Sequence, residues 1–171
     1  MTRVAIIGNA GGGKSVLARF ISERLDLPLH VIDDMQWQPG WRPAPQNAIA
    51  RQHAQWVASP RWVIDGWGPM HLIRQRFAAA DTIVFVDLPL WRHYWWAMKR
   101  HCKAVVGLRA GWPPPGCSIR GTWLPLVRLM HRIHHEIRPA LLTEIRSAPA
   151  EIIHVRSTRE LRRFRARVSA A

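Results

Sequence analysis

The sequence predicts an α/β fold, in which a parallel β-sheet is covered by helices on both faces, as a single domain over residues 1–171. Five short apolar segments with strand character alternate with segments of helical spacing. Apolar residues make up 48% of the chain, enough for one core, and no linker divides it. Three strand segments end in aspartate, at Asp33, Asp65 and Asp87. The carboxyl edge of the sheet, where such folds bind ligands, is therefore expected to be acidic.

The first half alternates strands and helices. Residues 4–7 are apolar and β-branched and end at Gly8, and residues 15–25 follow with apolar side chains at helical spacing. The run Asp26-Leu27-Pro28 ends that helix. The next predicted segments are a strand over 29–32, a turn-rich stretch over 35–44, a helix over 46–58, a strand over 61–64 and a short helix over 70–80.

The second half begins with a fourth strand over 82–86 and a tryptophan-rich helix over 90–103. Glycines and prolines predict a loop over 104–120. Residues 123–146 predict one or two helices, with Pro125 and Pro139 as boundaries or kinks. A fifth strand over 151–155 precedes Ser157 and Glu160, whose spacing matches a capping box that opens a last helix to about residue 168.

The charge of the chain is concentrated in its second half. Residues 1–85 carry 9 Lys/Arg and 6 Asp/Glu, a net of +3, and residues 86–171 carry 16 and 5, a net of +11, which gives +14 in total. A basic half attracts polyanions such as nucleoside phosphates, nucleic acid or an anionic surface. No apolar run approaches the ~18 residues of a membrane span, so no membrane partner is expected. The two cysteines favour a reducing, cytoplasmic location, and the oligomeric state is not indicated.

Residues 8–15 match the phosphate-binding pattern G-x-x-x-x-G-K-[ST] at every fixed position, between a strand and a helix. The glycines let backbone N–H groups curl around phosphate oxygens, and the helix N-terminus adds its positive dipole end. Lys14 is expected to reach the β- and γ-phosphates, and the Ser15 hydroxyl to bind Mg²⁺. The predicted nucleotide-binding residues of this segment are Gly8, Asn9, Ala10, Gly11, Gly12, Gly13, Lys14, Ser15 and Val16.

Two strand-end carboxylates are candidates for catalysis. Asp65 would bind Mg²⁺ together with Ser15 if the third strand lies beside the first, and its alternative role is a cap or turn residue. Asp33 would hold an acceptor hydroxyl or take its proton, with turn formation as the alternative. Asp87 precedes Leu88-Pro89 and is expected to be structural.

An ordered set of segments resembles the adenylate-kinase-like P-loop proteins known as DNA-topology-modulation proteins, over about residues 3–168. The segments are GNAGGGKS, HVIDDMQWQPGW, RWVIDGW, ADTIVFVDLP, PPPGC and RPALL. The resemblance implies a three-layer P-loop NTPase with a five-stranded parallel sheet in the order 2-3-1-4-5. It also implies a nucleoside- or nucleotide-kinase-like fold that binds ATP and Mg²⁺, with a lid over about 104–120.

The resemblance further implies that arginines of the lid close over the phosphates, and these would be among Arg100, Arg109 and Arg120. Arg156, after the fifth strand, would lie near the adenine. Nucleoside monophosphate kinases commonly carry an arginine soon after the Asp-Gly of strand 3. Here Asp65-Gly66 is followed by arginine only at positions 74 and 76, which weakens the assignment to a nucleotide acceptor.

The predicted activity is transfer of the γ-phosphoryl group of ATP to a small acceptor, which is a nucleoside, a nucleotide or a hydroxylated metabolite. Phosphoryl transfer requires positive charge around the transferring group and exclusion of water. The predicted catalytic residues are Lys14, Asp33, Asp65 and Arg100.

Other patterns leave alternatives open. Trp37 and Trp41 either wall an acceptor pocket or pack in the core, and the helical spacing of Trp91, Trp95 and Trp96 predicts core packing or a lid hinge. The alternative function is a nucleic-acid-associated ATPase or DNA-topology regulator that uses the basic C-terminal half. It is less favoured, because no nucleic-acid-binding motif accompanies the basic residues.

Overall fold

The computed structural model describes residues 1–108 and 116–170. It contains a parallel sheet of β1 (Arg3–Gly8), β2 (Leu29–Val31), β5 (Trp62–Asp65), β6 (Thr82–Val86) and β7 (Glu151–Val155), in the order β2-β5-β1-β6-β7. The predicted α/β fold with a five-stranded parallel sheet is confirmed. The order stated as 2-3-1-4-5 is corrected, because two short strands between β2 and β5, which were not predicted, form a separate sheet and shift the numbering.

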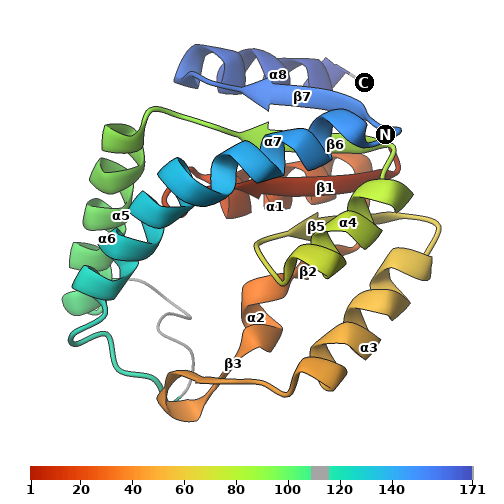
Figure 1. Cartoon of the computed structure of the whole chain (residues 1–171). Helices are drawn as coiled ribbons and strands as arrows, with labels where there is room; N and C mark the ends of the chain where they lie inside the picture. The colour runs from red at the N-terminus through yellow and green to blue at the C-terminus, as the bar shows by residue number, and fades with distance from the viewer. Residues whose placement is uncertain (109–115, 171) are drawn as a thin grey trace.

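Helices cover both faces of the sheet (Figure 1). On one face, Val4 and Ile6 of β1 pack in a core shared with α1 (Lys14–Leu25) and α8 (Thr158–Ala170). On the other face, Ala5 and Ile7 pack in a core shared with α4 (Met70–Ala79) and α7 (Arg138–Ser147). Alternate side chains of β1 thus supply the two cores, as the twofold repeat of a strand requires.

The remaining elements lie around the carboxyl edge of the sheet or outside it. They are α2 (Ile32–Gln36), β3 (Trp37–Gln38), the 3₁₀ turn Pro39–Trp41, β4 (Arg42–Pro43), α3 (Gln46–Ala58), α5 (Leu90–Val105) and α6 (Trp123–Arg132). The second strand ends at Val31, one residue earlier than predicted, and Asp33 and Asp34 lie in the first turn of α2. Acidic side chains there stabilise the positive end of a helix. Within the described ranges, none of the helices combines the length and apolar character needed to cross a membrane.

The segment predicted as a turn-rich insert forms an antiparallel ribbon of β3 and β4. Its tip contacts the end of the predicted lid: Gly40 N–H donates to the Gly116 carbonyl, 2.9 Å away, and Trp41 Nε1 donates to the Ser118 carbonyl at 2.7 Å. The rings of Trp37 and Trp41 meet edge to face, 5.7 Å apart. Arg109 and the rest of 109–115, which belong to the predicted lid, lie outside the described residues.

Between α6 and α7 the chain makes a π turn over Ile133–Ile137. Arg138 N–H donates to the carbonyl of Ile133, five residues earlier. Pro139 explains this wide turn, because it has no N–H for the α-helical bond and its ring would clash with the carbonyl four residues earlier. The predicted boundary at Pro139 is therefore a change of helix type, without a break in the helical path.

Candidate functional site

The loop that joins β1 to α1 has the backbone conformation of an anion-binding turn. Gly11 and Gly13 have φ angles of 71° and 78°, a left-handed region that side chains with a Cβ rarely adopt. Gly13 is the N-cap of α1, and no side chain of the described chain caps that first turn. Because the first turn also contains no acidic residue, its N–H groups and dipole are available to an anion.

Long-range hydrogen bonds fix the beginning of the loop. Trp67 Nε1 donates to the Gly8 carbonyl at 2.7 Å. The buried Asn9 side chain accepts from Ala10 N–H at 2.8 Å and donates through Nδ2 to the Met130 carbonyl of α6 at 2.8 Å. The loop is therefore held by α6 and by the segment after β5 as well as by its own turn.

Helix α5 packs directly on the loop. A Cβ at Gly11 would lie 2.5 Å from the His93 carbonyl oxygen, so a side chain at this position would displace the helix. The ring of the buried His93 donates from Nδ1 to the Ala10 carbonyl, 3.0 Å away. Burial lowers the pKa of His93 to about 4, against the raising effect of that hydrogen bond, so the ring is neutral at pH 7.

Lys14 is the first residue of α1, and its ammonium group turns back across the loop. Nζ donates to the Asn9 carbonyl at 2.8 Å. Burial lowers the pKa of Lys14, while the nearby carboxylates of Asp65 and Asp33 oppose this shift. These electrostatic effects place Lys14 within one charged cluster with both predicted catalytic aspartates.

Asp65 ends β5, which lies beside β1 as the predicted magnesium site requires. Its side chain is only 1% exposed, and its Oδ1 has no hydrogen-bond partner among residues 1–108 and 116–170. Burial raises the pKa of Asp65, while Lys14 and a hydrogen bond from Ser15 lower it. A buried carboxylate oxygen without a partner is costly, which marks it as a position where a ligand would complete the site.

Ser15 and Asp65 fit a Mg²⁺ ion by chemistry and position. Both supply hard oxygen donors, and the effect of Ser15 on the pKa of Asp65 indicates that the two side chains are close. The described part of the chain contains no group of three or more His, Cys, Asp or Glu side chains that could hold a metal. One carboxylate and one hydroxyl are the usual protein share for Mg²⁺ bound together with substrate phosphates and water.

Asp33 and Arg100 approach this cluster from two different elements. The Asp33 Oδ1 lies 3.5 Å from where a Cβ of Gly66 would stand, so α2 brings it beside the turn that follows Asp65. Burial lowers the pKa of Arg100, while the Asp33 carboxylate raises it. Arg100 in turn lowers the pKa of Lys14. The structure thus brings Lys14, Ser15, Asp33, Asp65 and Arg100 together.

Arg76 also belongs to the cluster, although sequence reasoning missed it as a site residue. Its side chain is 1% exposed and donates from Nη2 to the Gly66 carbonyl at 2.7 Å. Its Nε has no hydrogen-bond partner within the described ranges. Burial lowers the pKa of Arg76 to about 10, while Asp65 and Asp33 raise it. A signal existed, because Arg76 shares helical spacing with the buried Leu72 and Ile73, so it interrupts an apolar helix face.

Several other residues singled out in the sequence have exposed side chains. Arg156 is exposed after β7, where its N–H donates to Glu160 and its Nε to His154 Nδ1, 3.3 Å away. Arg120 is exposed, Val16 is exposed on the first turn of α1, and Asp34 is an exposed residue of α2. Trp96 is half-buried beside the core, whereas core packing is wrong for the exposed Trp91 and Trp95.

Asp87, which follows β6, lies in an ion cluster of its own. It accepts two hydrogen bonds from Arg138, both 2.7 Å long, and one from His154 Nε2 at 2.8 Å. Burial raises the pKa of Asp87, but these hydrogen bonds outweigh it and hold the pKa below its ordinary value. The geometry agrees with the structural role predicted for this residue, since it ties α7 and β7 to the end of β6.

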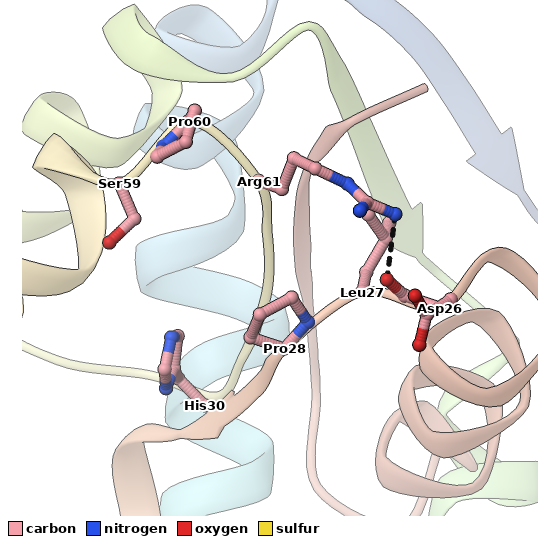
Figure 2. Close-up of a pocket in the computed structure, with 7 residues that line it drawn as sticks. All are labelled: Asp26, Leu27, Pro28, His30, Ser59, Pro60 and Arg61. Carbon is pink, nitrogen blue, oxygen red and sulfur yellow. Dashed lines mark hydrogen bonds between the residues drawn. The ribbon is translucent and has the colours of Figure 1, made fainter.

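A hollow lies away from this cluster, at the amino-terminal ends of β2 and β5 (Figure 2). Its volume is about 700 Å³, and Pro28, His30, Ser59 and Arg61 are among the residues that line it. Arg61 donates to the carbonyls of Leu25 and Asp26, so its guanidinium holds the backbone at the end of α1. The hollow is open and lies at the edge opposite the glycine loop, and nothing connects it to the chemistry described above.

No protein-family profile and no curated protein sequence matches the chain. Among solved structures it is similar to a "putative kinase" from Chloroflexus aurantiacus J-10-fl, with 15% identity, 91% of this chain and 89% of that chain covered, and a TM-score of 0.50. It is also similar to a sugar kinase from Janibacter sp. HTCC2649 (16% identity, 82% and 98% covered, TM-score 0.44). A third is a gluconokinase from Sinorhizobium meliloti 1021 (12%, 84% and 97% covered, TM-score 0.38). The first of these likenesses supports the α/β fold described above.

Proposed function

We propose that the chain is an ATP- and Mg²⁺-dependent phosphotransferase that acts on a small acceptor. The observation that carries the proposal is the convergence of Lys14, Ser15 and the unsatisfied Asp65 carboxylate at the N-terminus of α1, behind a glycine loop. A loop of this conformation, with a lysine and a hydroxyl at these two places, is suited to a triphosphate. The name of the Chloroflexus protein that shares the fold is that of a kinase, which agrees with this function.

The proposed roles follow from position. The N–H groups of Gly8 to Val16 surround the phosphates, and Lys14 leaves the Asn9 carbonyl to bind them. Ser15 and Asp65 hold Mg²⁺, which supplies neutralisation of phosphate charge when it is bound. Arg109 and Arg156 are proposed to contact the nucleotide, on the basis of the family resemblance. Membership of the DNA-topology-modulation family is part of the same proposal.

The acceptor is proposed to bind between α2 and α5, which carry Asp33 and Arg100. The Asp33 carboxylate accepts the hydrogen of an acceptor hydroxyl, and Arg100 stabilises negative charge on the transferring group. The buried Arg76 fixes the carbonyl of Gly66 and so positions the turn that carries Asp65. A nucleoside, a nucleotide or a hydroxylated metabolite remains the proposed acceptor class.

The test measures phosphate transfer from ATP to a panel of nucleosides, nucleotides and hydroxylated metabolites. Lys14→Ala is expected to lower turnover about a hundredfold or more, because it removes a charge aimed at the transferring phosphate. The matched control is Lys103→Ala on the exposed part of α5, which should turn over at the wild-type rate. Equal turnover by Lys14→Ala and the wild type would remove the loop from the mechanism.

A further inference from the structure

Helix α5 presents its large apolar side chains to the solvent. Trp91, Trp95, Met98 and Val105 are 60%, 47%, 39% and 59% exposed, and their spacing of four, three and seven residues puts them on one side of the helix. We call these four side chains the outer stripe. The opposite side of the helix, with the buried His93, Ala97 and Ala104, faces the protein. Large apolar side chains therefore lie on the solvent side of α5, where a surface helix usually carries polar ones.

Cations flank the outer stripe. The Arg92 guanidinium lies over the Trp91 ring, 4.5 Å from its centre, and Lys99 Nζ lies 4.6 Å from the centre of the Trp95 ring. Lys103 is exposed one helical turn further on. In the sequence from residue 88 to residue 135 there is no Asp or Glu, while lysine or arginine stands at positions 92, 99, 100, 103, 109, 120, 128 and 132. With Arg92, Lys99 and Lys103 beside it, and no acidic residue in its stretch of the sequence, the stripe is complementary to an anionic surface.

We infer that the outer stripe of α5 is a peripheral binding site for an anionic lipid bilayer. Indole rings prefer the headgroup level of a membrane, aliphatic side chains enter the acyl boundary, and basic side chains bind anionic headgroups. The stripe extends about 21 Å along the helix, so α5 lies parallel to the surface. Such a helix needs no apolar run of spanning length, which is why the sequence led to the opposite expectation of no membrane partner.

Two other occupants fit the stripe less well. A second copy of the chain would bring two basic segments without acidic residues face to face, and like charges repel. A single-stranded nucleic acid would stack on the tryptophans, but the aliphatic side chains of Met98 and Val105 offer no stacking surface. Neither the stripe nor its flanking cations Arg92, Lys99 and Lys103 belongs to the proposed phosphotransfer site, so this inference does not depend on that function.

The test is sedimentation of the full chain with vesicles of phosphatidylcholine alone and of phosphatidylcholine mixed with phosphatidylglycerol. Binding is expected only to the anionic vesicles, and it should weaken as salt is added. The double variant W91S/W95S should lower the partition coefficient about tenfold or more. The control I152S removes an apolar side chain of β7 that is 38% exposed, and it should bind as the wild type does.

A second pair of variants separates the stripe from the overall charge. K99E/K103E and R162E/R163E change the net charge equally, but only the first pair flanks the stripe. K99E/K103E should lower binding about tenfold more than R162E/R163E does. Equal losses for the two pairs, equal binding to neutral and anionic vesicles, or no vesicle binding would each overturn the inference. Retention of an oligothymidylate through Trp91 and Trp95, without vesicle binding, would assign the stripe to nucleic acid instead.

Discussion

Asp65 ends β5 and Asp87 follows β6, the two strands on either side of β1, yet the two carboxylates are in opposite electrostatic situations. Asp87 has three hydrogen bonds from Arg138 and His154, and its pKa is lowered. Asp65 is more deeply buried, its Oδ1 has no partner in the described chain, and its pKa is raised. A carboxylate whose hydrogen bonds are complete holds elements together, whereas one left incomplete inside the protein costs stability and is suited to a ligand.

The largest expected effect tests whether Asp65 serves a ligand. Asp65→Asn should lower phosphate transfer about a hundredfold or more, because the neutral amide cannot help to hold Mg²⁺ against the phosphates. Its free energy of unfolding should stay within about 1 kcal/mol of the wild type, since the shape of the side chain is kept. Steady-state rates across a magnesium titration, with urea melts beside them, check both points. An unchanged magnesium dependence would count against this role.

The second effect tests whether the hydrogen bonds of Asp87 stabilise the fold. Asp87→Asn should lower the free energy of unfolding by about 1–2 kcal/mol, because Arg138 loses its charged partner at a position that is partly open to solvent. Phosphate transfer by the folded variant should stay within a few fold of the wild type. Urea denaturation gives the first quantity, and rates measured well below the melting temperature give the second. A variant of full stability and low activity would reverse the roles assigned to the two aspartates.

The smallest effect is a difference in pH dependence. The folded chain raises the pKa of Asp65 above its ordinary value of 3.8, so the stability linked to its protonation is present at low pH and lost as the pH rises through the raised pKa. The lowered pKa of Asp87 acts in the other direction: its contribution is present above 3.8 and lost as the pH falls through the folded-state pKa.

Urea melts of both Asn variants and the wild type, over about pH 3 to 8, should separate the two curves. Relative to the wild type, Asp65→Asn should gain stability with rising pH and Asp87→Asn should lose it. Asp81 provides a control, because burial raises its pKa but hydrogen bonds from Thr2, Arg3 and Thr82 lower it to about 2. The stability that Asp81 loses at acid pH is the same in the wild type and in both variants, so it does not contribute to the differences between their curves. Parallel curves for the variants would contradict the opposite shifts.

The sequence predicted the parts of the fold and site that depend on neighbouring residues. The glycine loop, the start of α1 and the strand ends at Asp65 and Asp87 follow from local pattern. The contact of Asn9 with Met130 depends on a helix distant in sequence, so no local pattern specified it. The outward tryptophans of α5 were misplaced because helical spacing shows that side chains share a face, and it does not say which face is buried.

The π turn between α6 and α7 sets the rotation about the helix axis between two anchors, which are contacts to other parts of the protein on either side of the turn. Just before it, the Met130 carbonyl binds Asn9 of the glycine loop, and just after it, Arg138 binds Asp87. One residue of an α-helix corresponds to a rotation of about 100°, so shortening the turn by one residue would swing one anchor away from its partner. An insertion or deletion in this stretch is therefore expected to misplace one of the two anchors.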